Sequence, residues 1–200
     1  LALAHAQLDA AQRWALGAPA AEPARMRLGA EALDALAQLY EERGRAADAQ
    51  RLNTQALALA QALPPAAAGE LPAALQWRQA RLAQARRQPA AALAAWRQAV
   101  RRLEDLRQDI PIDDDSGASS FRALLEPVYL GLLDALLAAA PAGAAPQPGG
   151  LLREAVDTVE LIRQAELQDY LGDRCEVDTV KGGTATVLPP GTAVLYTLLL

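Results

Sequence analysis

The chain offers one pairing of a nucleophile with a base, the thiol of Cys175 and the imidazole of His5, each the only residue of its type. A cysteine becomes a reactive thiolate when a base or a positive charge lies close to it. These two residues are separated by most of the sequence, and on the extended helical stack inferred below they fall at opposite ends. A catalytic dyad is therefore disfavoured. We interpret His5 as a helix residue and Cys175 as a structural thiol.

Metal and cofactor chemistry are equally restricted. One histidine and one cysteine cannot make a zinc site. The acidic loop 110–119 holds three consecutive aspartates, 113–115, followed by Gly117. It does not have the ligand order of an EF-hand, because Ile112 and Ala123 stand where two ligands are needed. There is also no glycine-rich loop of the kind that binds phosphate, so we predict no catalytic residue, metal ligand or cofactor in this sequence.

Cationic charge comes almost entirely from arginine, since Lys181 is the only lysine. Binding of nucleic acid would require a group of arginines on one surface, interleaved with aromatic side chains. The candidates spread over two predicted helices and several faces: Arg78, Arg81, Arg86, Arg87, Arg97, Arg101, Arg102 and Arg107. The net charge of −5 and the pI of about 5.0 argue against nucleic acid and anionic lipid as partners. No apolar run reaches the roughly eighteen residues of a membrane-spanning helix.

Polar residues on two predicted helices form the best candidate binding site. On the first helix they recur at spacings of three and four, opposite an apolar stripe, and on the second they follow 43 residues later. The predicted partner-binding residues are Glu31, Asp34, Gln38, Glu41, Trp77, Arg81 and Gln84. Acidic side chains beside an accessible tryptophan are suited to a segment with one basic and one apolar side chain. The alternative is a solvated polar face with Trp77 enclosed between helices.

The helices that carry these residues belong to an internal repeat. Small residues at Ala37, Ala49 and Ala56 let two helix backbones approach, while larger apolar residues fill the space beside them. Alanines recur 43 residues later at 80, 92 and 99. Because one helical hairpin cannot bury its apolar face alone, we expect the copies to stack.

The first copy resembles a tetratricopeptide (TPR) repeat. The residues that carry the resemblance are Leu33, Leu36, Ala37, Tyr40, Gly44, Ala49 and Ala56. The spacing of 43 residues exceeds the roughly 34 of a standard TPR, because the helices are longer and a Pro-Pro connector separates the hairpins. The resemblance implies an all-α, right-handed stack of antiparallel helix hairpins, with repeats at 1–17 (a second helix only), 25–64 and 71–107. It also implies that the polar face of each first helix lines a concave groove.

The second half of the chain is predicted to hold a further helix pair, 119–172, and then a β tail. The first helix, 121–140, is apolar almost all round, so we expect burial on more than one side and a kink at Pro127. A Pro- and Gly-rich connector, 141–150, precedes a helix from 151 to about 171. The last residues, 176–200, are rich in valine and glycine and predict a short strand or hairpin.

The tail resembles the junction found in CHAT-domain proteins, in which TPR arrays lead into a caspase-like domain. The matching features are Glu154 with Ala155, the stretch 166–170, Asp173 with Cys175, and the strand opening at 193–196. The resemblance implies that 176–200 are the linker and first strand of such a domain, usually bacterial, which would contact the repeats of its own chain. The His and Cys of that domain would follow its first strand, so no catalytic residue is carried over.

The chain lacks an initial methionine and ends on three leucines, and we therefore expect a non-catalytic, regulatory fragment of a larger cytoplasmic protein that binds a protein or peptide partner. The alternative is a TPR scaffold of another bacterial signalling assembly, unrelated to proteolysis. An apolar strand at 194–200 without its sheet would present an unpaired edge, which predicts that the fragment forms a tail-mediated dimer.

Overall fold

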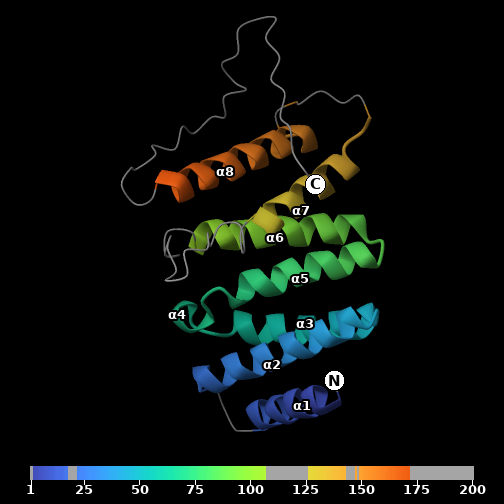
Figure 1. Ribbon diagram of the computed structural model, residues 1–200, viewed down its shortest axis with the longest axis vertical. Helices are drawn as coiled ribbons and strands as arrows, with labels where there is room; N and C mark the ends of the chain where they lie inside the picture. The colour runs from blue at the N-terminus through green and yellow to red at the C-terminus, as the bar shows by residue number, and fades with distance from the viewer. Residues whose placement is uncertain (1, 18–21, 107–125, 143–146, 148, 172–200) are drawn as a thin grey trace, which may run out of the picture. The chain divides into compact units, whose positions relative to one another are not determined.

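The computed structural model describes residues 2–17, 22–106, 126–142, 147 and 149–171. All regular elements within these ranges are α-helices (Figure 1), so the predicted all-α class is confirmed. The chain divides into two compact units, Leu1–Gln108 and Asp109–Leu200, which are treated separately below. The predicted β tail, 176–200, and the acidic loop, 110–119, lie outside the described residues.

Unit 1 is a series of helices in which each long helix packs against the next along the chain (Figure 1). Several of them begin with proline in the first turn, where the missing backbone N–H costs nothing because that group has no partner within the helix. The helices are α1 (Ala2–Leu16), α2 (Pro23–Glu42), α3 (Ala46–Gln61), α4 (Pro65–Ala68), α5 (Leu71–Ala85) and α6 (Pro89–Leu106).

The two complete hairpins, α2–α3 and α5–α6, turn with the same backbone geometry. After α2, Gly44 adopts φ +70° and the amides of Gly44 and Arg45 donate to the carbonyls of Glu41 and Tyr40, both at 2.9 Å. This pair of bonds is the Schellman motif, which ends a helix on a left-handed residue.

The same motif ends α5, 43 residues later. Arg87 adopts φ +57°, and the amides of Arg87 and Gln88 donate to the carbonyls of Gln84 and Ala83 at 2.9 and 3.0 Å. The repeat seen in the alanine spacing is therefore repeated in the hydrogen bonds of the turn, even though arginine replaces glycine at the left-handed position.

The alanines of the repeat are buried, as their predicted role requires. Ala37 and Ala80 lie on the first helices, and their partners at 49, 56, 92 and 99 lie on the second helices, all with almost no exposed surface. Larger side chains such as Leu33, Leu36 and Leu75 fill the core beside them. Small residues at the crossing and leucines around it are what close helix packing requires.

The connector between the hairpins holds the one-turn helix α4, which ends at Gly69. Gly69 has φ +52° and ψ −136°, a conformation in which a Cβ atom is strongly disfavoured. Arg27 on α2 secures this connector by donating to the Ala67 carbonyl at 2.9 Å and to the Glu70 carboxylate at 3.1 Å. The start of α5 is thereby fixed against α2.

Unit 2 contains α7 (Glu126–Ala139) and α8 (Leu151–Leu171), which pack against each other. Both bury an apolar stripe, with Leu133 and Leu136 on α7 and Val159 and Ile162 on α8 among the buried residues. Burial of α7 is less complete than predicted, because Leu137 remains 42% exposed. The predicted kink at Pro127 stays untested, since α7 is described only from Glu126. Among the described helices, none is both long and apolar enough to span a bilayer.

Candidate partner-binding site

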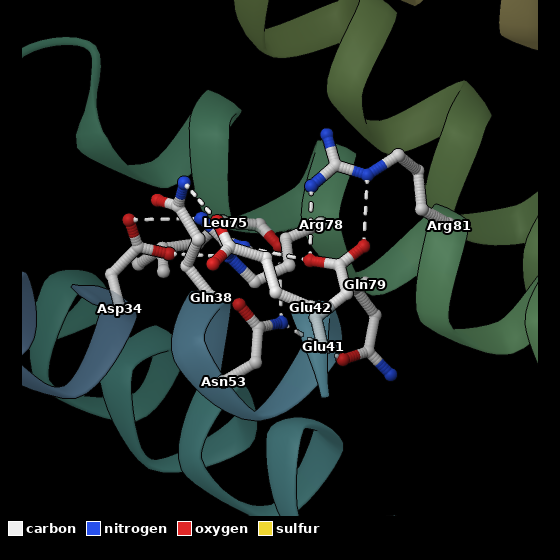
Figure 2. Close-up of polar contacts among 9 residues, drawn as sticks. All are labelled: Asp34, Gln38, Glu41, Glu42, Asn53, Leu75, Arg78, Gln79 and Arg81. Atoms are coloured by element: carbon white, nitrogen blue, oxygen red, sulfur yellow. Dashed lines mark hydrogen bonds and ion pairs between the residues drawn. The ribbon is translucent and has the colours of Figure 1, made fainter. Parts of the chain in front are cut away.

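Two arginines of α5 and two carboxylates of α2 form an ion network between the first helices of successive hairpins (Figure 2). We call Asp34, Glu41, Arg78 and Arg81 the Arg78 cluster. Arg78 donates from Nε to Asp34 Oδ1 and from Nη1 to Glu41 Oε2, both at 2.7 Å. Arg81 donates to both oxygens of the Glu41 carboxylate at 3.1 Å. Glu41 is thus shared by the two arginines.

The two arginines differ in how far they are removed from water. The Arg78 side chain is 10% exposed and that of Arg81 is 36% exposed. A buried guanidinium is tolerated only when its donors are paired. Arg78 meets this condition, because its third nitrogen, Nη2, also lies 3.4 Å from Asp34 Oδ2. Arg78 therefore joins the two hairpins and has no nitrogen left for a partner molecule.

The pKa of Glu41 is lowered by this arrangement. Burial acts to raise the pKa of the carboxyl, but the hydrogen bonds and positive charges of Arg81 and Arg78 outweigh it and leave the pKa below its ordinary value. Glu41 is therefore ionised at neutral pH, as its shared position between the two arginines requires.

A second polar contact joins the hairpins from within. Asn53 on α3 is fully buried, and its Nδ2 donates to the backbone carbonyl of Leu75 at 3.1 Å and to Gln79 Oε1 at 3.0 Å, both on α5. Its Oδ1 has no hydrogen-bond partner among the described residues. Sequence reasoning did not single out Asn53 as a functional or structural site. The sequence feature that could have revealed it is an amide side chain on the helix stripe that is otherwise apolar.

The remaining predicted site residues lie around the cluster. Glu31 accepts from Arg27 Nε at 2.7 Å, and this bond is the main cause that raises the pKa of Arg27. Gln38 donates to the exposed carboxylate of Glu42 at 3.2 Å (Figure 2). Gln84 is exposed at the end of α5. Glu31 and Gln38 therefore make local contacts outside the ion network.

Trp77 is half-buried, midway between the two predicted alternatives of an accessible and an enclosed ring. The Arg81 guanidinium carbon lies 4.8 Å from the centre of the Trp77 ring, within the range of a cation–π interaction. Of the seven predicted residues, the structure therefore brings Asp34, Glu41, Arg81 and Trp77 into one connected group.

Arg78, which holds this group together, was considered from sequence only as part of a basic surface. Its role could have been suspected from the spacing of Asp34 and Glu41, seven residues and two helical turns apart on one face, with an arginine on the equivalent helix of the next repeat.

The other chemical candidates find no support as sites in the described residues. His5 is exposed on α1, where its Nε2 lies 3.0 Å from the Tyr40 hydroxyl and its ring meets the Tyr40 ring edge-on. Cys175 and the acidic loop lie outside the described residues. No group of three potential metal ligands occurs in the part of the chain that the structure describes. No family model, curated protein or solved structure matches the chain.

Proposed function

We propose that residues 2–106 are a TPR-like protein-interaction region, and that the face formed by α2 and α5 binds a segment of a peptide or protein partner. The observation that carries the proposal is the Arg78 cluster. It joins the first helices of two successive hairpins into one surface, in which Arg81 is partly exposed and Trp77 lies partly exposed beside it. A rigid surface that spans two repeats is suited to an extended segment, because little conformational freedom is lost on binding.

The repeated turn geometry supports the TPR-like assignment. Both hairpins end their first helix with the same two hydrogen bonds, and both begin their second helix two residues after the left-handed position, at Ala46 and Pro89. Equal hairpins packed in series form the arrangement in which TPR proteins create a concave groove, and α2 and α5 are the helices that would line it.

The wider proposal is that this region regulates a CHAT-type domain of the same chain. It rests on the sequence resemblance of residues 151–175 and 191–200, of which 151–171 are described and form α8. A cytoplasmic TPR scaffold of another bacterial assembly is the alternative. The two differ in whether a caspase-like domain with its His and Cys follows the tail in the complete protein, and the complete sequence decides between them.

The binding proposal is tested by selecting peptides from a phage-displayed random library against the whole chain, and then measuring each peptide with variants. Trp77→Ala is expected to weaken binding at least about tenfold, since aromatic anchors dominate such interfaces. Trp14→Ala is the matched control, because Trp14 is also approached by an arginine, Arg25 at 4.0 Å from the ring centre, but lies on α1.

Failure of the selection to yield binders, or equal binding by the Trp77→Ala and wild-type chains, contradicts the assignment of this face. Asp34 is a poor probe despite its place in the site. Its replacement removes one of the two carboxylates that pair with the buried Arg78 and disturbs the fold as well as the surface. The Trp77→Ala chain is checked by its circular dichroism, so that a loss of binding is not mistaken for a loss of structure.

A further inference from the structure

We propose that the partner segment carries an acidic side chain next to an apolar one, with the carboxylate bound by the outer edge of Arg81 and the apolar side chain lying on Trp77. This inference rests on the proposed function and specifies its ligand. It reverses the charge expected from the sequence, where Glu31, Asp34 and Glu41 predicted a basic segment.

One side of the Arg81 guanidinium is not used in the contact with Glu41. Arg81 bonds Glu41 through Nε and Nη2. Its Nη1 makes no hydrogen bond within the described residues, and Figure 2 shows this nitrogen directed away from Glu41. A guanidinium carries five N–H donors in one plane and binds carboxylates with two of them side by side. Arg81 can therefore hold Glu41 with one edge and a second carboxylate with another.

The carboxylates of the Arg78 cluster are already paired and are less accessible than Arg81. Asp34 and Glu41 are both committed to Arg78, and Glu41 also to Arg81. Their side chains are less exposed than that of Arg81, at 23% and 26% against 36%. The most accessible charge of the cluster is therefore positive. A basic partner would have to use Glu42, which already accepts from Gln38, or Glu31, which already accepts from Arg27.

Arg81 also contacts the Trp77 ring. The cation–π contact and the Glu41 bonds hold the guanidinium on the ring, so that Arg81 is oriented before a partner arrives. Trp77 is only partly buried, so its side chain keeps some exposed surface near this charge. An acidic and an apolar side chain that are neighbours in a peptide match these two adjacent groups.

The test uses three pools of short peptides, acetylated and amidated at their ends, with a central Glu-Leu, Gln-Leu or Lys-Leu and mixed flanking residues. Binding is followed by the indole N–H signal of Trp77 in nitrogen-labelled whole chain. The chain has three tryptophans, so Trp14 and Trp96 serve as internal references. The Glu-Leu pool is expected to shift the Trp77 signal at about tenfold lower concentration than the other two pools.

The variants separate this idea from binding in general. Arg81→Gln is expected to abolish the preference for Glu-Leu, and Arg81→Lys is expected to abolish it too, because the single nitrogen of lysine stays with Glu41. Arg45→Gln is the matched control, since Arg45 also covers an aromatic ring, Tyr40 at 4.5 Å, and pairs with an acid, Asp48. It should leave the preference unchanged.

Each outcome decides between the two proposals. If Trp77 shifts equally with the Gln-Leu or Lys-Leu pool, or if Arg81→Gln keeps the preference, the acidic ligand is wrong and the binding face stands. If no pool shifts the Trp77 signal, both the ligand and the face are contradicted.

Discussion

Replacing Arg87 by glycine should stabilise unit 1. Arg87 ends α5 with φ +57°, the position that Gly44 occupies after α2 with φ +70°. A left-handed conformation costs a residue with a Cβ about 1–2 kcal/mol, while glycine adds about 0.4–1 kcal/mol of entropy to the unfolded chain. The Arg87 side chain is exposed and forms no ion pair within the described residues, so little else is lost. The net gain is about 0.5–1 kcal/mol.

The assay is urea unfolding followed by tryptophan fluorescence. All three tryptophans lie in unit 1, so the signal reports this unit within the whole chain. With an m-value of about 1.5 kcal/mol/M, the Arg87→Gly midpoint should rise by about 0.3–0.7 M. Arg86→Gly is the matched control, because Arg86 precedes Arg87 but has φ −89°, a conformation that gains nothing from glycine.

The converse change gives a second check on the same turn. Gly44→Ala should lower the midpoint by a similar amount, and for backbone reasons alone, because a Cβ at Gly44 would meet no atom within 4 Å. An unchanged or lower midpoint for Arg87→Gly, together with a neutral Gly44→Ala, would refute the claim that both turns use a left-handed residue.

Three further outcomes follow from the polar contacts between the hairpins. Arg78→Ala should cost about 3 kcal/mol in urea unfolding, because it leaves the partly buried Asp34 carboxylate unpaired and removes one of the two arginines that bind Glu41. Arg13→Ala in the exposed pair on α1 should change stability by less than about 0.5 kcal/mol, and equal effects would contradict the ranking. Asn53→Ala should cost about 1–2 kcal/mol through the lost bond to the Leu75 carbonyl, and a neutral result would mean that this bond contributes nothing. The pKa of Glu41 lies below its ordinary value in the folded chain, so its ionisation contributes stability that is present above pH 4.5 and lost as pH falls through the folded-state pKa. Glu41→Gln should therefore make the free energy of unfolding fall less steeply with decreasing pH. An unchanged slope would mean that other carboxyls cause the loss of stability in acid.

Local patterns in the sequence were sufficient for the helices and for their packing faces. The burial of Ala37 and Ala80 follows from helical periodicity, and Gly44 predicts its own turn, because these signals are contained in a few neighbouring residues. Arg87 occupies the equivalent turn although nothing in its residue type favours it. Its conformation is imposed by the packing of α5 and α6 on either side, which overrides local preference.

Contacts between hairpins could not be predicted in the same way. The pairing of Arg78 with Asp34 joins residues 44 positions apart and depends on the position of α5 along the axis of α2. One turn of slippage would place Arg78 beside other side chains, and the sequence alone does not fix that distance. Asn53 was missed for the same reason, since its partners, the Leu75 backbone carbonyl and the Gln79 side chain, lie on the next hairpin.

The Arg78 cluster also limits what the binding face can recognise. A carboxylate that holds a buried arginine cannot be given to a partner without unpairing that arginine, so Asp34 and Glu41 contribute to specificity only through the arginines they position. The groups that can recognise a partner are then those not already bonded within the chain, namely the outer edge of Arg81 and the exposed part of Trp77. Because Glu41 occupies a different edge of the guanidinium, a partner that binds Arg81 leaves the bonds between the hairpins intact. Binding should therefore raise the urea midpoint of unit 1, because a ligand that binds the folded chain and not the unfolded chain stabilises the fold.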